Sequence, residues 1–240
     1  MRLISKVKSV LADVRRFGLW PALHIRMCRY AEALVGAMCL RIVRIEPDDL
    51  QTREYLEELP GYNSEFLSAE RLRREARSHP DLNPEFIEEA LARGDRCYAL
   101  LSEDSLAAYG WYATVPTPID DAAVFQFASD WVYMYKGYTS REHRGRRLHG
   151  IGMSRALVAF GDEGYRGLIS FVASSNYASL RSCARMGYQV VGSVRWLGVG
   201  TKRRFFHSRS SRRAGVRVAP ATAEGPTASD PPAREPRLAA

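Results

Sequence analysis

The residues best suited to chemistry lie in one basic, glycine-containing turn between positions 139 and 152. Glycines let a backbone approach a ligand closely, and successive amides that open a helix can bind phosphate oxygens. Arginines add charge-assisted hydrogen bonds to phosphate. The turn therefore predicts a pyrophosphate site, although a basic surface loop without a ligand would have the same composition. Its arginines and glycines are Arg144, Gly145, Arg146, Arg147, Gly150 and Gly152.

The sequence on either side supplies the elements that would hold such a turn. Val124 to Tyr138 is rich in aromatic and β-branched residues, which favour strands that cross a sheet. A helix is expected from about Leu148 to Glu163. A strand, a turn and the free N–H groups at the start of a helix together form a phosphate-binding arrangement.

The remaining segments predict a mixed α/β fold whose first half is antiparallel. Helices are expected at 3–14, 21–38, 50–58, 64–77, 84–94 and 177–186, and strands at 40–45, 97–101, 106–113, 167–173, 188–196 and 197–206. The tight turn at 103–105 makes a hairpin of two of these strands. We expect three regions: an N-terminal helical extension (1–39), a catalytic domain (40–207) and a disordered tail rich in Arg, Pro and Ala (208–240).

The segment from Glu142 to Leu148, EHRGRRL, resembles the acyl-CoA motif of the GNAT superfamily of N-acetyltransferases, in which an Arg-Gly pair opens a Gly-rich turn. One alignment with the family motif places its Arg-Gly pair at Arg144 and Gly145. In this register, two later glycines of the family are replaced by Arg147 and His149. A second register, set by Arg147, satisfies R-x-x-G-x-G. The first is favoured because it places Leu148, Ile151 and Ala156 on the following helix, and either leaves the amides of residues 146–150 near the phosphates.

A second match follows at the separation typical of the family. Residues 176–181, NYASLR, and 185–188, RMGY, resemble the strand-loop-helix pattern N-x-x-S-L-R that ends in a glycine turn. The resemblance implies that Asn176 and Ser179 contact the pantetheine and phosphate parts of the cofactor. Their alternative roles are to satisfy the loop backbone and to supply a helix N-terminal hydroxyl. Gly187 is expected to end the helix.

The resemblance covers Leu40 to Phe206 and implies both a fold and a reaction. The fold is a central, mixed, mostly antiparallel twisted sheet of about six to seven strands flanked by helices. The reaction is direct attack of an amine on acetyl-CoA or another acyl-CoA, with Tyr138 and Thr139 at the reacting end. The implied cofactor contacts are Tyr138, Thr139, Arg144, Gly145, Arg146, Arg147, Leu148, His149, Gly150, Asn176 and Ser179.

Catalysis would also need a base for the amine proton and an acid for the departing thiolate. Asp130, at the start of the central strand, is our candidate base, with Tyr133 and Tyr135 as alternatives. Many family members place a tyrosine acid four residues before the helix-terminal glycine, where this chain has Cys183. A thiol with a pKa of about 8.5 suits that task. Cys183 would equally serve as an ordinary buried helix residue.

The net charge and the composition limit the classes of partner that the protein can have. The net charge of +8 favours an anionic partner, and four scattered cysteines support neither a disulfide framework nor a metal site. The acceptor is expected to be a small-molecule or protein amine, and an acyl carrier protein is an alternative donor. No nucleic-acid-binding motif is recognisable. Because the sequence shows no continuous signal-peptide core or membrane span, we expect a cytoplasmic protein.

The basic, amphipathic N-terminal helix from Leu3 to Val14 has three candidate roles: it could pack on the domain, dimerise, or lie on an anionic membrane. A different class of function also stays open. The chain could be a catalytically idle CoA-binding scaffold whose basic termini bind nucleic acid or an anionic membrane.

Overall fold

One mixed sheet organises the molecule, and the computed structural model describes residues 2–77 and 82–221, with side chains from residue 10 onward. Its eight strands are β1 (Met38–Ile45), β2 (Asn63–Phe66), β3 (Arg96–Ser102), β4 (Ser105–Ala113), β7 (Trp131–Thr139), β8 (Gly167–Ala173), β9 (Gln189–Leu197) and β10 (Arg204–His207). Their order is β10-β9-β1-β8-β7-β4-β3-β2. Only β7 and β8 among these neighbours run parallel, so the expected mostly antiparallel sheet is confirmed.

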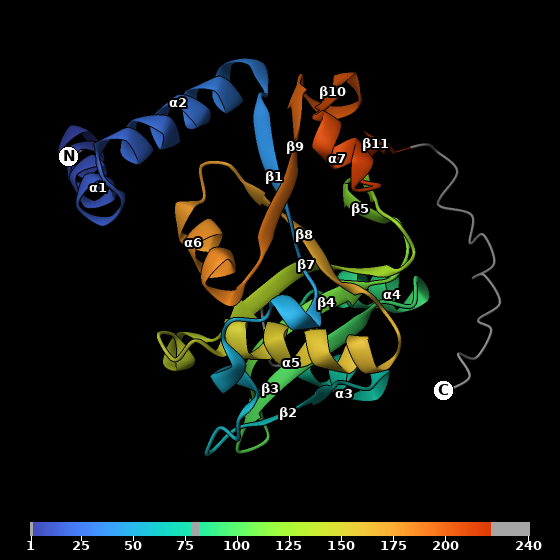
Figure 1. Ribbon diagram of the computed structural model, residues 1–240. Helices are drawn as coiled ribbons and strands as arrows, with labels where there is room; N and C mark the ends of the chain where they lie inside the picture. The colour runs from blue at the N-terminus through green and yellow to red at the C-terminus, as the bar shows by residue number, and fades with distance from the viewer. Residues whose placement is uncertain (1, 78–81, 222–240) are drawn as a thin grey trace.

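Helices cover this sheet, and an N-terminal pair extends away from it (Figure 1). The helices are α1 (Arg2–Phe17), α2 (Leu19–Val35), α3 (Ala69–Glu75), α4 (Pro84–Ala92), α5 (Leu148–Asp162), α6 (Tyr177–Met186) and α7 (Arg209–Arg213). Short 3-10 turns are η1 (Pro47–Asp49), η2 (Arg53–Leu56), η3 (Arg141–His143) and η4 (Gly200–Lys202). The expected α5 and α6 are confirmed to within one residue.

Alternation along β3 divides the core into two layers. Cys97 and Ala99 pack with Leu72 of α3 and Ile87 of α4 on one face. Tyr98, which lies between them in sequence, packs instead with the cluster beneath α5. Side chains on a strand alternate between faces, so helices on both faces require apolar residues at successive positions. This explains why almost all of β3 and β4 is buried.

The central strands separate after a short parallel ladder. β7 pairs with β8 from Trp131 to Tyr133, opposite Gly167 to Ile169. Beyond Tyr133, β7 pairs with β4 as far as Thr139, while β8 pairs along its length with β1. The two strands therefore diverge toward their carboxyl ends. α5 and α6 follow those ends and flank the opening.

A second, three-stranded sheet corrects the expectation of a disordered tail from residue 208. β5 (Thr117–Asp120), β6 (Ala123–Gln126) and β11 (Arg217–Pro220) pair in the order β11-β6-β5. Val216 and Val218 are almost fully buried in the adjoining core, and Ser208 caps α7. Two valines and one cap thus order a segment that is otherwise basic. The part of the predicted tail at 222–240 lies outside the described residues.

Two further expectations were wrong. The helix expected at 50–58 is reduced to the single turn η2, and residues 63–66 form the edge strand β2 instead of starting a helix. β2 forms because Phe66 finds partners on the sheet, where its ring packs against the rings of Tyr98 and Phe160. The main sheet accordingly has more strands than the six to seven expected.

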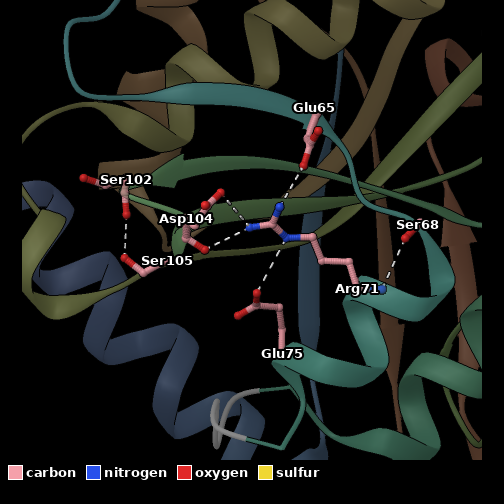
Figure 2. Close-up of polar contacts among 7 residues, drawn as sticks. All are labelled: Glu65, Ser68, Arg71, Glu75, Ser102, Asp104 and Ser105. Carbon is pink, nitrogen blue, oxygen red and sulfur yellow. Dashed lines mark hydrogen bonds and ion pairs between the residues drawn. The ribbon is translucent and has the colours of Figure 1, made fainter.

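Arg71 of α3 links three separate segments at the outer edge of the sheet (Figure 2). Its guanidinium donates to the Asp104 carbonyl at 2.9 Å in the β3–β4 turn and to Glu65 of β2 at 3.3 Å. Glu75, one turn along α3, lies 3.7 Å away. The Ser68 hydroxyl accepts a hydrogen bond from the backbone amide of Arg71 and so caps α3. The edge strand is therefore held by side chains as well as by its ladder with β3.

Gly187 at the end of α6 should be the glycine most sensitive to substitution for two separate reasons. Its φ is +106°, and an added Cβ would lie 2.0 Å from the Asp49 carbonyl oxygen. We predict that Gly187→Ala lowers the free energy of unfolding by about 2–4 kcal/mol, measured by denaturant titration. Gly164→Ala is the matched control, because Gly164 has a φ of +89° with open space around it. It should cost about 1 kcal/mol, and equal losses would contradict the steric argument.

Candidate functional site

A pocket of about 280 Å³ lies where β7 ends and α5 begins. The end of β7, the turn after it, the first turn of α5, one face of α6 and η2 all contribute to its wall. Because α5 follows β7 and α6 follows β8, the pocket lies beyond the carboxyl end of β7, between the helices that follow the two strands. Its lining residues are Tyr55, Thr139, His143, Arg144, Gly145, Arg147, Leu148, His149, Gly150, Ser182 and Arg185.

The backbone of the turn exposes the amides of α5. Gly145 and Arg147 adopt positive φ values of +83° and +60°. Arg147 is the N-cap residue, and among the described residues no side chain caps the helix. The first helical amides have no partner within a helix, so those of residues 148–150 remain available to a ligand. A left-handed arginine is strained, and such strain is often found where a backbone is shaped for binding.

Positive charge dominates the pocket wall. Arg144, Arg147 and Arg185 line it, and none of its lining residues in the described chain is acidic. The Arg144 Nε donates to the Thr139 carbonyl at 3.2 Å, which draws this side chain across the turn. The dipole of α5 adds partial positive charge at the same place. The pocket is therefore suited to an anion with several oxygen atoms.

Tyr62 fixes the outer side of the turn. Its hydroxyl lies 2.8 Å from the Nδ1 of His143 and accepts a hydrogen bond from Arg146 Nη1 at 2.9 Å. Arg146 is thereby directed toward Tyr62 and does not line the pocket. A larger hollow of about 800 Å³ lies beside Tyr62, bordered by Glu58, Glu103 and other residues. It adjoins the turn and lies away from the place where β7 and β8 separate.

His149 lies directly on β7. Gly137 makes room for it, because a Cβ there would lie 2.3 Å from the His149 ring. Gly137 faces Gly110 across the β4–β7 ladder, so the two glycines leave a local gap on this face of the sheet. His149 lines the pocket and is exposed there in part, yet desolvation by the surrounding protein lowers its pKa. A neutral imidazole is therefore favoured at neutral pH.

The point where the strands separate is fastened by one side-chain hydrogen bond. Ser170 of β8 donates its hydroxyl to the Met134 carbonyl of β7 at 2.7 Å. From Met134 to Thr139, β7 spans about 17 Å. Along this length its edge faces the opening between the strands, which offers backbone groups to an extended ligand.

The structure brings most of the predicted cofactor residues together. Seven of them line the pocket: Thr139, Arg144, Gly145, Arg147, Leu148, His149 and Gly150. Tyr138 does not, because its ring stacks on Tyr109 at 5.5 Å within the cluster that includes α3 and α4 residues. Asn176 caps α6, because its side-chain oxygen accepts a hydrogen bond from the Ser179 amide at 3.1 Å. This agrees with its alternative role, in which it satisfies the backbone locally. Neither Asn176 nor Ser179 lines the pocket.

The glycines of the two motif registers have different roles. Gly145 has a positive φ, and a Cβ there would meet only open space. Gly150 and Gly152 are needed for packing, because their Cβ atoms would lie 3.0 Å from Tyr55 and 2.8 Å from Leu100. Leu148 and Ala156 are buried in α5, as expected from the register of Arg144 and Gly145.

Asp130 is not part of this site. It immediately precedes β7, at the end opposite Thr139, and its half-exposed side chain lies 4.0 Å from Arg166. Nine residues of strand separate the two ends by about 30 Å. Its alternatives are also displaced, because Tyr133 is buried and Tyr135 donates its hydroxyl to Asp95 at 2.9 Å. Asp95 is a buried carboxylate whose pKa is raised, chiefly by desolvation.

Cys183 is half-buried against the core and does not line the pocket. Burial raises the pKa of its thiol to about 11. The thiol therefore keeps its proton at neutral pH, but it is a weaker acid than an ordinary thiol with a pKa of about 8.5. These features agree better with the alternative of an ordinary helix residue than with a proton donor.

Three pocket residues escaped the sequence reasoning. Ser182 and Arg185 lie three and six positions after Ser179 on α6. Ser182 and Arg185 are three positions apart and share a helix face, whereas Ser179 does not line the pocket, so the motif residue did not point to them. Tyr55 comes from η2, and no local signal connects that turn with the helix it meets.

Comparisons with known proteins give structural matches only. No model of a protein family matches the chain, and no curated protein matches its sequence. A Drosophila protein of known structure is 14% identical over 77% of this chain and 58% of its own, with a TM-score of 0.48. A GNAT-family protein from Novosphingobium aromaticivorans, named as an acetyltransferase, is 14% identical over 66% of this chain and 62% of its own, with a TM-score of 0.46.

A third matching structure holds a CoA derivative. It is AAC(6')-Iy in complex with the bisubstrate analogue CoA-S-monomethyl-acetylneamine, 12% identical over 62% of this chain and 97% of its own, with a TM-score of 0.42. The chain spans about three fifths of the length of the first two structures. Within the described residues, no His, Cys, Asp and Glu side chains gather as a metal site, and no helix is both long and apolar enough to cross a bilayer.

The left-handed backbone conformation of Arg147 gives a prediction that distinguishes the effect of backbone strain on stability from the effect of losing the charge. Arg147→Gly and Arg147→Ala remove the same guanidinium, but only glycine adopts a φ of +60° without a steric penalty. We expect the glycine variant to be more stable than the alanine variant by roughly 1 kcal/mol in denaturant unfolding. Equal stability of the two variants would mean that the turn relaxes in solution.

The lowered pKa of His149 gives a pH prediction. The unfolded histidine has a pKa of about 6.5, so below that pH the unfolded chain takes up a proton that the folded chain resists. Stability contributed by neutral His149 is present above about pH 6.5 and is lost as the pH falls. We predict that unfolding free energies measured at pH 7.5 and 5.5 differ less in His149→Gln than in the wild type.

A second histidine must be separated from the first in that experiment. Desolvation also lowers the pKa of His207, whose Nε2 accepts the Val218 amide. His207→Gln should therefore remove a separate share of the acid sensitivity, and the double variant should lose both shares. An unchanged pH dependence in His149→Gln would refute the assignment.

Proposed function

We propose that this protein is an N-acyltransferase that transfers an acyl group from acyl-CoA to an amine. The observation that carries the proposal is the basic pocket at the start of α5, because it combines free helix amides with Arg144, Arg147 and Arg185. Such an arrangement suits a pyrophosphate. The open edge of β7 continues directly from this pocket.

The two features suit the two parts of an acyl-CoA donor. The pyrophosphate would bind the amides near Arg147 to Gly150. The pantetheine arm would then run along β7 from Thr139 toward Met134, where backbone groups can pair with its amides. The thioester would lie near the Met134–Ser170 hydrogen bond, about 17 Å from the turn. This position differs from our sequence expectation, which put the reacting end at Tyr138 and Thr139.

The reaction forms a bond between the amine nitrogen and the thioester carbonyl carbon and breaks the C–S bond. A neutral amine is needed, so its proton must pass to a base or to water. We propose His149 for this role in place of Asp130. Its ring packs over Gly137, three residues from Met134, and favours its neutral form. Asp130, by contrast, is half-exposed beside Arg166. With its raised pKa, Cys183 is not proposed as the acid, and the thiolate would take its proton from water.

The acceptor is proposed only as a class, an amine on a small molecule or on a protein. The large hollow beside Tyr62 is not proposed as its binding site, because it borders the turn and lies away from Met134. An acyl carrier protein is an alternative donor, since its phosphopantetheine arm would suit the same phosphate site and its acidic surface would suit a basic chain.

One observation favours a second candidate function, CoA binding without turnover. Neither of the two catalytic residues expected from the sequence lies at the pocket, because Asp130 is at the far end of β7 and Cys183 packs into the core. Such a protein would bind the donor and release no CoA with any amine. Measuring thiol release alongside binding distinguishes the two functions.

The decisive experiment is calorimetric titration of acetyl-CoA into the full-length protein. We expect saturable binding that weakens at least about tenfold in Arg144→Ala/Gly145→Glu, because one cationic partner is lost and an anion enters the turn. Arg166→Ala is the control for loss of an arginine elsewhere, since Arg166 pairs with Glu46 next to the start of β8, at the end of the sheet opposite the turn. Absence of binding at millimolar acetyl-CoA, or equal weakening in the control, would refute the proposed donor site.

A further inference from the structure

An uncovered apolar stripe runs along α2. Its side chains are separated by one, three or four positions, which on a helix places them within an arc of about 100°. Each is between 50% and 80% exposed. Isolated exposed apolar residues are common, but a continuous set of this length on one helix face marks an interaction surface. The stripe consists of Leu19, Trp20, Leu23, Met27, Tyr30 and Leu34.

The opposite side of α2 carries Ala22, which is buried, together with the exposed charged residues Arg29 and Glu32. Arg29 and Glu32 border a hollow of about 600 Å³ between α2 and the ends of β1, β8 and β9. A helix that packs on a domain for its own stability places its apolar face inward. α2 packs inward only through small or partly buried residues such as Ala22 and Ile25, while its larger apolar side chains point outward, so the stripe is left for something else to cover.

Specific contacts hold α2 in this orientation. Arg26 pairs with Asp13 of α1 at 2.8 Å, which joins the two helices into a hairpin. The Arg181 guanidinium of α6 donates to the Arg16 carbonyl at 3.1 Å, and the Tyr177 hydroxyl lies 3.0 Å from His24 Nδ1. At the far end of α2, the Gly198 amide donates to the Val35 carbonyl at 3.0 Å. The stripe is therefore anchored facing outward.

Charge favours one occupant over another. Residues 1–37 contain seven Arg or Lys and two Asp or Glu, a net charge of +5 out of +8 for the whole chain. Two copies joined through α2 would bring these charges together and repel. An anionic surface attracts them, by about 1 kcal/mol for each basic residue near it. The aromatic members, Trp20 and Tyr30, are the types that favour a membrane interface.

We propose that the α1–α2 hairpin docks the protein on an anionic lipid surface, with the α2 stripe inserted among the headgroups. The stripe supplies the apolar contact and the basic residues of the hairpin supply the attraction. Docking uses residues outside the donor pocket, so this proposal does not rest on the proposed acyltransferase activity.

Trp20 supplies an intrinsic reporter for this docking. It is 79% exposed, whereas Trp111, Trp131 and Trp196 are at most 8% exposed. Mixing the protein with phosphatidylglycerol-containing vesicles should shift its emission to the blue and sediment the protein, and pure phosphatidylcholine vesicles should do neither. Trp20→Phe should keep the sedimentation and lose the shift. Sedimentation without any shift of Trp20 would overturn the insertion of the stripe.

Matched charge variants separate insertion from simple attraction. Trp20→Glu/Leu23→Glu should lower vesicle binding by roughly tenfold or more, because it removes two apolar contacts as well as two units of net charge. The control Leu56→Glu/Val190→Glu adds the same charge at exposed apolar positions outside α2 and should change binding much less. Equal loss in both variants would overturn the proposal.

Self-association is the competing outcome, and sedimentation velocity tests it. We expect that the wild type forms no dimer through the stripe, so Trp20→Glu/Leu23→Glu should not change the oligomeric state. If such a dimer forms and the wild type does not bind anionic vesicles, the stripe is an interface between two copies and the proposal is wrong. Circular dichroism of every variant checks that the fold is retained.

Discussion

The separation of β7 from β8 is the constraint on which the proposed site depends. Two parallel strands that stayed paired to their ends would satisfy each other's backbone groups and leave no room between them. Here the ladder covers Trp131 to Tyr133, and each strand then follows a different neighbour. The opening costs some backbone pairing, which Ser170 partly offsets at Met134. α5 and α6 follow the two strands, and the first turn of α5 meets the second half of α6 at the pocket.

The turn before α5 shows how local chemistry and the sheet combine. Gly145 and Arg147 bend the chain sharply enough for α5 to start immediately, and Gly150 and Gly152 let that helix lie close to its neighbours. Positive charge and free amides therefore occur together at the end of a buried strand. Because the sheet fixes the strand, the amides are positioned before any ligand arrives, which reduces the ordering that binding requires.

Sequence reasoning succeeded where local signals decide structure. α6 begins with a capping asparagine and ends at Gly187, and both of its ends were predictable. It failed where distant contacts decide. The strand at 63–66 depends on aromatic partners from other elements, and the order of residues 209–220 depends on a core formed nearly one hundred residues earlier. Asp130 was a different failure, because strand length alone places it far from Thr139.

α6 belongs to two surfaces at once. Ser182 and Arg185 face the pocket, while Tyr177 and Arg181 hold the N-terminal hairpin. Any displacement of the hairpin must therefore be accommodated by the same helix that forms one wall of the pocket. If hairpin engagement changes the position of α6, the free energies of engagement and of pocket occupancy are coupled, and the coupling acts equally in both directions. The helix would then act as a thermodynamic link between location and activity.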